Sequence, residues 1–324
     1  MLSRVANSIY WMNRYVERAE NYARFMGVTF NLILDLPPGG QQQWEPMLLA
    51  SGDNHLFYKH YDKPAPENVL RFISFDPNNP NAVLSCLYKA RENARSIREI
   101  ISKEMWEHLN QFYHRIRELS GKKKWNMDNW QDFFSEVKMG SQLFFGIIDS
   151  TITRNEGWHF GRLGRYIERA DKTSRFIDVK YFILLPETDF VGSNYDQLQW
   201  SAVLKSVSAF NMYRQTHRSI NPSEIVEFLV LGREFPRSIY YCLQQAELSL
   251  KKIQSDAPLG RPAVKLLGKL LSHLEYSDVN DIFVFGLHEY LDNFQSSLNK
   301  VGDAVFDAYF ALKPVSESAG SGEQ

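Results

Sequence analysis

The chain has 324 residues, of which 44% are hydrophobic and 23% are charged. These fractions are close to the averages of soluble globular proteins, so they exclude a chain that is mainly disordered or fibrous. Lys plus Arg number 37 and Asp plus Glu number 38, which leaves a formal net charge of -1 and excludes recruitment of nucleic acid by an overall positive field.

The predicted elements are helices along the whole chain. The first runs from the N-terminus to Leu34 and ends before LPPGG, and the next boundary is DPNNP before Asn81. Residues 81–119 repeat apolar side chains at intervals of three and four, with no internal Gly or Pro. Later boundaries are the predicted loop PETDFVGSNYDQ, NPSE before Ile225, and EFPRS, where Pro236 fits the first turn of a helix. Strand-like alternation of any length is missing, so the predicted fold class is all-α.

Two cysteines, Cys86 and Cys242, are too few for a disulfide framework or a tetrahedral zinc site. We expect both to be buried packing residues in a reducing compartment. Arg4, Arg14 and Arg18 interrupt the N-terminal stretch where a signal peptide needs its apolar run. No later stretch reaches about 18 uncharged apolar residues. We therefore expect a cytoplasmic protein with no membrane partner.

An internal duplication organises the chain. RYVERAENYARFMGV and RYIERADKTSRFIDV are separated by an offset of 151. The recurring residues are Arg14, Tyr15, Glu17, Arg18, Ala19, Arg24, Phe25 and Val28, which reappear as Arg165, Tyr166, Glu168, Arg169, Ala170, Arg175, Phe176 and Val179. Farther along, the offset becomes 156 and relates Trp44 to Trp200 and Pro80 to Pro236.

We predict two homologous halves, 1–155 and 156–315, followed by a flexible tail over 316–324. Each half supplies about five helices, which must bury their apolar stripes on one another. The predicted architecture is a helical bundle built from two pseudo-symmetric repeats, with the second half packed on the first.

Each copy of the repeated segment carries a charged stripe on one helical face. The stripes consist of Arg14, Glu17, Arg18, Asn21 and Arg24 in the first copy and Arg165, Glu168, Arg169, Lys172 and Arg175 in the second. The arginines and glutamates of the stripe are identical in the two copies, whereas the other face changes, for example from Tyr22 to Thr173. Three interpretations remain open: a water-facing ladder of ion pairs, buried Arg–Glu pairs that join the two copies, or a polar cleft that holds an anionic ligand.

Three further residues are candidates to extend the stripes. They are Glu92 and Arg95 in ARENARSIREI, and Arg237 in GREFPRS, where a predicted helix start also suits an anion. The alternatives are an exposed helix with ion pairs along it for the first two, and a plain Pro-initiated helix for the third.

Four carboxylates could converge on a metal ion, because Glu17 and Glu20 stand three apart in the first copy and Glu168 and Asp171 stand three apart in the second. Di-iron bundles pair Glu with a His three residues on, no His stands three residues after any of these four carboxylates, and the neighbouring arginines would repel a cation. The sequence also lacks the GxSxG, GxxxxGK, HExxH and CxxC patterns. We therefore predict no metal and no cofactor, and no catalytic residue is assigned.

The segments LSRVANSIYWMNRYVERAENYARF, LYKARENARSIREII, HFGRLGRYIERADKTSRF and FPRSIYYCL together resemble the bacterial alpha-E domain family, over nearly the whole chain. The resemblance implies an all-helical protein encoded beside a circularly permuted ATP-grasp protein and a transglutaminase-like protein. That neighbourhood implies a role in a peptide or amide-bond-forming system. The family's glutamates correspond to Glu17 and Glu168, with no chemical role implied.

The first hypothesis is an accessory, non-catalytic protein that works with an ATP-grasp amide ligase and binds it, or an anionic peptide-like substrate, through an Arg/Glu cleft. The second hypothesis makes Glu17 or Glu168 a general base in that cleft. The third makes the stripes a structural clamp between the halves and leaves the function elsewhere. The oligomeric state is left open.

Overall fold

The computed structural model describes residues 1–34, 44–122, 125–182, 194–253 and 260–311. The first part of the chain forms α1 (Ser3–Leu34), α2 (Glu45–Ser51), α3 (Asn54–Phe57), α4 (Pro66–Ser74), α5 (Val83–Ser96), α6 (Lys103–Ser120) and α7 (Met127–Thr151). The second part forms α8 (Glu156–Phe182), α9 (Asn194–Ser206), α10 (Phe210–Thr216), α11 (Pro222–Val226), a π-helical turn η2 (Glu227–Leu231), α12 (Ile239–Ile253), α13 (Arg261–Glu275), α14 (Val279–Phe285) and α15 (Leu287–Tyr309). Every regular element in these ranges is helical, which confirms the all-α fold class. None of these helices is both long enough and apolar enough to cross a membrane.

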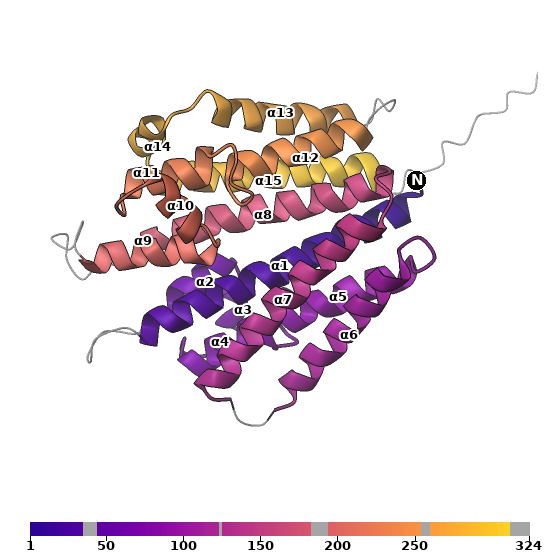
Figure 1. Ribbon diagram of the computed structural model, residues 1–324, viewed down its shortest axis with the longest axis horizontal. Helices are drawn as coiled ribbons and strands as arrows, with labels where there is room; N and C mark the ends of the chain where they lie inside the picture. Colours follow the sequence, from indigo (N-terminus) through magenta and orange to yellow (C-terminus); the bar gives the residue numbers. More distant parts are fainter. Residues whose placement is uncertain (35–43, 123–124, 183–193, 254–259, 312–324) are drawn as a thin grey trace, which may run out of the picture.

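Two long helices, α1 and α8, pack side by side through the middle of the molecule (Figure 1). α1 also packs against α5 and α7, and α8 also packs against α12 and α15. α6 covers α5 and α7 on one side of the pair, and α13 covers α12 and α15 on the other. The short helices cross over, since α2 contacts α8 and α9 contacts α1. The central pair therefore joins the two parts of the chain.

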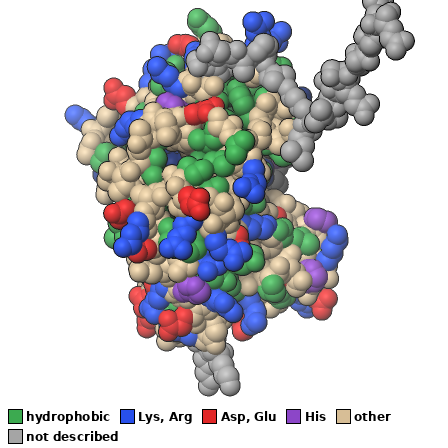
Figure 2. All heavy atoms as spheres, turned by 90° about the vertical axis from the view of Figure 1, so that its right-hand side faces the viewer, with side chains coloured by type: hydrophobic (Ala, Val, Ile, Leu, Met, Phe, Trp, Pro, Cys, Tyr) green, Lys and Arg blue, Asp and Glu red, His purple; other side chains and the backbone are tan. Residues whose placement is uncertain are grey.

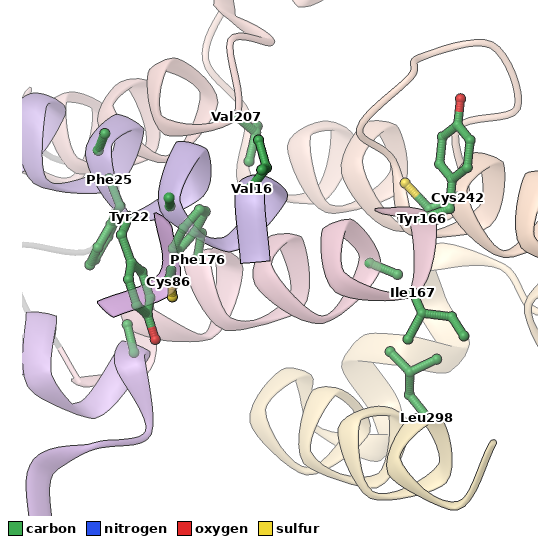
Figure 3. Close-up of a cluster of buried hydrophobic side chains, with 14 of the residues drawn as sticks. Val16, Tyr22, Phe25, Cys86, Tyr166, Ile167, Phe176, Val207, Cys242 and Leu298 are labelled. Atoms are coloured by element: carbon green, nitrogen blue, oxygen red, sulfur yellow. The ribbon is translucent and has the colours of Figure 1, made fainter. Parts of the chain in front are cut away.

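α1 and α8 run in the same direction and approach each other closely. Near the start of the pair, a Cβ atom added to Gly164 would lie 2.5 Å from the carbonyl oxygen of Tyr10, so only glycine permits this approach. Farther along, Phe25 and Phe176 stack with ring centroids 4.6 Å apart (Figure 3). This geometry brings residues at an offset near 151 next to each other.

Side-chain caps decide where two of the predicted helices begin. Residues 81–119 form two helices rather than one continuous run, because the hydroxyl of Ser102 accepts a hydrogen bond from the backbone N–H of Met105 and starts α6 there. Pro236 lies in a turn before α12 rather than in its first turn, and Ser238 accepts from a backbone N–H at the helix start. Within 1–34, 44–122 and 125–151, the described residues form seven helices, several of them short, where about five were expected.

The remaining predicted features are helix boundaries, a loop, the C-terminal tail and the two cysteines. Asn221 caps α11 directly before Pro222, at the boundary predicted from NPSE. The LPPGG boundary, most of the predicted loop PETDFVGSNYDQ and the tail 316–324 lie outside the described residues. Cys86 and Cys242 are free and fully buried, as expected (Figure 3), and burial raises the pKa of each thiol to about 12.

Candidate functional site

The charged stripes of α1 and α8 face each other instead of the solvent. Glu17 is fully buried and accepts two hydrogen bonds of 2.8 Å from the guanidinium of Arg169. Glu168 is also fully buried, and it accepts hydrogen bonds of 2.6 and 2.9 Å from Arg18. Each fork-shaped guanidinium holds a carboxylate of the opposite helix. The structure therefore excludes a water-facing ladder for these four residues.

Around Glu168 the described residues form a first charged cluster. Nε of Arg14 donates to Glu168 at 2.9 Å, and Arg18 donates additionally to Asn81. The amide of Asn81 in turn donates to Asp53 at 2.9 Å. Burial raises the pKa of the Glu168 carboxyl, but the charges of Arg18 and Arg14 outweigh it and lower the pKa to about 2. Glu168 is therefore ionised at neutral pH.

Three residues of α8 continue this cluster. The ammonium of Lys172 lies 3.9 Å from Glu168 and 3.1 Å from Asp171, and Arg175 donates to Asp171 at 3.0 Å. Burial lowers the pKa of Lys172, against the raising effect of Asp171 and Glu168. We call this set the Glu168 centre. Its members are Arg14, Arg18, Asp53, Asn81, Glu168, Asp171, Lys172 and Arg175.

A second cluster surrounds Glu17. Arg237 reaches it from the turn before α12 and donates to Glu17 at 3.2 Å, to Asn21 at 2.9 Å and to Glu20 at 2.7 Å. Burial raises the pKa of Glu17, but Arg169 and Arg237 together move it far below its usual range. Arg237 was a candidate to extend the stripes, with a plain Pro-initiated helix as the alternative, and the structure joins it to these two buried carboxylates.

The remaining member of the second cluster is Arg24, which donates to Glu20 at 2.6 and 2.9 Å and also to Ser208. We call this set the Glu17 centre. Its members are Glu17, Glu20, Asn21, Arg24, Arg169 and Arg237. Among the described residues, no group of three or more His, Cys, Asp or Glu is arranged to hold a metal ion.

Three predicted residues form no hydrogen bond with either centre. Arg165 lies 3.6 Å from Glu17, an ion-pair contact that is too long for a hydrogen bond. Glu92 forms ion pairs with Arg91 at 2.7 Å and with Arg95 at 2.5 Å on the outer side of α5, and the Arg95 side chain is 65% exposed. In the described part of the chain, no ion pair joins Glu92 or Arg95 to either centre, so these two do not extend the stripes.

The Glu168 centre borders a cleft of about 450 Å³. α1, α8, α15 and the turn after α2 form its walls, and apolar side chains such as Trp11 and Phe306 complete the lining. The charged lining residues are Arg14, Arg18, Asp53, Asp171, Lys172, Arg175 and Asp303. The side chains of Arg14, Arg18 and Arg175 are 14 to 23% exposed, whereas those of Arg169 and Arg237 are 5 and 9% exposed. The Glu168 centre is therefore accessible, and the Glu17 centre is closed.

Lys172 belongs to the predicted charged stripe, but the contributions of Asn81 and Asp53 were not predicted from the sequence. A signal was present for Asn81: it corresponds to Arg237 at the offset of 156, just as Lys172 corresponds to Asn21 at the offset of 151. Each centre thus has one amide and one cation at these two positions, in exchanged order. For Asp53 the sequence contains no such correspondence, because its position relative to Asn81 depends on the packing of α2 and α3.

Comparison with known proteins gives the chain a family. The model of the Alpha-E family, described as a predicted alpha-helical domain with a conserved ER motif, matches residues 1–310. The dipeptide Glu-Arg occurs twice in this chain, as Glu17–Arg18 and as Glu168–Arg169. These four residues exchange hydrogen bonds between α1 and α8.

The chain is 22% identical to uncharacterised proteins of Mycobacterium bovis and of Mycobacterium tuberculosis strain CDC 1551, and 21% identical to one of Mycobacterium tuberculosis strain H37Rv. Each match covers 95% of this chain and 37% of the relative, so the chain spans little more than a third of these relatives. No solved structure matches the chain. The family model and the two Glu-Arg pairs show that the chain belongs to the Alpha-E family.

Proposed function

We propose that this Alpha-E chain is an accessory, non-catalytic protein of an amide-bond-forming system, and that its cleft beside the Glu168 centre binds a peptide-like ligand. The observation that carries the proposal is the cleft itself, in which partly exposed guanidinium groups are held in place by a buried carboxylate. Because Glu168 fixes Arg14 and Arg18, their orientation is set before a ligand arrives, which lowers the entropic cost of binding.

The charge of the cleft fits a ligand with both an amine and a carboxylate. Arg14, Arg18, Lys172 and Arg175 supply positive charge, and guanidinium groups bind carboxylates through paired hydrogen bonds. Asp53, Asp171 and Asp303 supply acceptors for an amine. A peptide carries both groups, whereas a simple anion would use only the first.

The alternative, an enzyme with Glu17 or Glu168 as general base, is less well supported. A general base works best with a pKa near the operating pH. The pKa of Glu168 is lowered to about 2, and that of Glu17 is lowered further. Both carboxylates also already accept hydrogen bonds from two or more arginine side chains. These properties favour holding arginines over moving protons.

The proposed partners are a circularly permuted ATP-grasp protein and a transglutaminase-like protein, and the proposed location is the cytoplasm. The support is the family resemblance and the length of the relatives. The Mycobacterium proteins contain this chain's equivalent within a polypeptide nearly three times as long. Such an arrangement suits a module that acts next to another domain.

We also infer that residues 1–155 and 156–315 are two copies of one helical repeat, related by an approximate two-fold axis between α1 and α8. Reciprocal contacts support this inference. Glu17 pairs with Arg169 while Glu168 pairs with Arg18, as a two-fold axis requires of equivalent residues. Phe25 stacks on its own counterpart, Phe176.

Gly302 of α15 offers a way to fill the cleft without disturbing the centre. It lines the cleft, and a Cβ atom added there meets nothing within 4 Å. Gly146 of α7 has the same free space but lines no part of the cleft, so Gly146→Leu is a matched control for Gly302→Leu. Both changes replace a glycine within a helix by a better helix former.

The test uses titration calorimetry with alanyl-glutamate and, separately, with the ATP-grasp protein of the same genome. We expect the wild type and Gly146→Leu to bind the dipeptide equally, and Gly302→Leu to bind it at least about tenfold more weakly. Equal binding by all three chains, or none by the wild type, refutes the cleft as the ligand site. If the wild type does not bind the ATP-grasp protein, the partnership is refuted separately.

A further inference from the structure

We propose that a second pocket, at the N-terminal ends of α1 and α8, binds a small amphiphilic anion that has an apolar body and a carboxylate or phosphate head. The pocket has a volume of about 530 Å³ and shares no lining residue with the cleft of the Glu168 centre. Its size lies within the range of ordinary small-molecule sites. The proposal is independent of the peptide-like ligand assigned to the cleft.

The pocket combines a basic wall with an apolar wall. Arg154, Arg162 and Arg165 form the basic wall on and just before α8. The apolar wall consists of Ile9, Met12, Ile101, Met105, Ile148 and Ile152. The N-terminal ends of both helices lie on the side of the molecule that faces the viewer in Figure 2, where Lys and Arg side chains gather across the middle among hydrophobic ones.

Arg165 is a lining residue whose hydrogen-bond donors are unused. Its counterpart Arg14 donates to Glu168 at 2.9 Å, but the buried Nε of Arg165 has no hydrogen-bond partner. Glu17, the carboxylate in the corresponding place, is already held by Arg169 and Arg237. The Nε of Arg165 lies 3.6 Å from Oε2 of Glu17, which is an ion-pair distance but too long for a hydrogen bond. None of the described residues accepts a hydrogen bond from Arg165, so its guanidinium can still donate to an anion in the pocket.

The position of the Arg165 guanidinium is nevertheless fixed. It lies 3.8 Å from the ring centroid of Phe145, in a cation–π contact on the pocket wall. An arginine that is held by an aromatic ring, with its hydrogen-bonding edge unused, is prepared for a planar acceptor such as a carboxylate.

Arg162 and Arg154 repeat this arrangement around Trp158. Their guanidinium carbons lie 5.0 and 4.7 Å from the Trp158 ring, and the Nε of Arg162 is also buried without a partner. Against these three cations the lining contains one carboxylate, that of Asp149. The lining therefore carries an excess of two positive charges, which an anionic head would reduce.

The two walls together select the class of ligand. A small inorganic anion would satisfy the arginines and leave the isoleucine and methionine wall hydrated. Arg162 donates to Gln245 through Nη2, but its Nε has no partner. An uncharged hydrocarbon would cover the apolar wall and leave the donors of Arg165 and the Nε of Arg162 unpaired, at a desolvation cost. An amphiphilic anion matches both walls at once.

Four probes separate these cases by titration calorimetry: decanoate, decyl phosphate, decanol and inorganic phosphate. We expect decanoate or decyl phosphate to bind at least about tenfold more tightly than decanol and inorganic phosphate, and the tighter of the two identifies the head group. Equal binding of decanol and decanoate, or no binding of either amphiphilic anion, overturns the proposal.

Variants locate the binding. Arg165→Gln removes the unpaired donors while Glu17 keeps Arg169 and Arg237, and we expect decanoate and decyl phosphate to bind at least about tenfold more weakly. Arg233→Gln is the matched control, because Arg233 also lies over a ring, 4.9 Å from Tyr240, but outside the pocket. If Arg165→Gln proves unfolded in a thermal melt, Ile148→Glu adds a carboxylate to the lining and must weaken binding by a similar factor. A folded variant of either kind that retains full affinity overturns the proposal.

Discussion

The Glu17 centre and the Glu168 centre start from the same Glu-Arg motif and end in different surroundings. At the Glu168 centre the additional cation is Lys172, which belongs to the same helix as the carboxylate. At the Glu17 centre it is Arg237, which comes from the turn before α12. A cation supplied from a distant segment brings that segment over the carboxylate and closes the site. A cation supplied from the same helix leaves space above, and the cleft lies there.

The comparison also indicates why both centres need so many arginines. A carboxylate that is fully removed from water costs several kcal/mol unless charge and hydrogen bonds replace its hydration. Glu17 and Glu168 are each held by guanidinium groups of the opposite helix. The seam between α1 and α8 therefore specifies which surfaces meet, and a wrong alignment would leave buried charges unpaired.

The largest effect is expected when either buried carboxylate is neutralised. Glu17→Gln leaves Arg169 buried without its counter-charge and leaves Arg237 with Glu20 alone, which costs about 3–5 kcal/mol of the free energy of unfolding. Glu168→Gln costs less within that range, because Arg14 and Arg18 can be hydrated through the cleft. Urea unfolding measures both. A larger loss for Glu168→Gln would contradict the contrast between a closed and an open centre.

The surface pair provides the control for this experiment. Glu92 is partly exposed and pairs with Arg95, whose side chain is mostly exposed. Glu92→Gln is therefore expected to change the free energy of unfolding by no more than about 0.5 kcal/mol.

Lowering the pH should destabilise the fold by protonating the same two carboxylates, Glu17 and Glu168. The folded-state pKa of Glu168 is about 2, below the ordinary glutamate value of about 4.3. The resulting stabilisation is complete above pH about 5 and is lost as the pH falls toward 2, and it amounts to about 3 kcal/mol for this group. Urea unfolding at a series of pH values checks the window. The Glu168→Gln variant should show a shallower fall, and an unchanged slope would contradict the assignment.

An exchange of residues tests whether Arg237 closes the Glu17 centre. Arg237→Asn removes charged hydrogen bonds to Glu17 and Glu20 and is expected to cost about 2 kcal/mol. Adding Asn21→Lys restores one cation in the manner of Lys172 and should recover about 1 kcal/mol. A double-mutant cycle in urea measures the coupling. Strict additivity of the two changes would show that the amide and the cation do not compensate each other.

The smallest predicted difference concerns the ends of the stripes. Arg24 is 8% exposed and bonds to Glu20, whereas Arg175 is 23% exposed and bonds to Asp171. Arg24→Gln is expected to cost about 2 kcal/mol and Arg175→Gln about 1 kcal/mol, since water can replace more of the contact at the exposed site. Thermal melts compare the two, and the reverse order would contradict the difference in solvent access.

The sequence allowed the all-α fold class and the members of the two charged stripes to be predicted, because helical periodicity fixes which side chains share a face. It did not allow the neighbours of that face to be predicted. Asn81, Asp53 and Ser208 join the centres through the packing of short helices and turns, for which no periodicity exists. The charge pattern of Glu92 and Arg95 resembles that of the stripes, but only burial distinguishes a surface pair from a seam. The break between α5 and α6 depends on a single serine cap, which the apolar pattern does not reveal.

The reciprocal ion pairs between α1 and α8 affect how the protein unfolds. Glu17 in the first part of the chain is neutralised by Arg169 and Arg237 of the second part. Glu168 in the second part is neutralised chiefly by Arg14 and Arg18 of the first part. Separated halves would each expose an uncompensated seam to water and lose the stacked Phe25 and Phe176. Heat should therefore unfold the chain as one cooperative unit, with a single calorimetric transition in place of two independent ones.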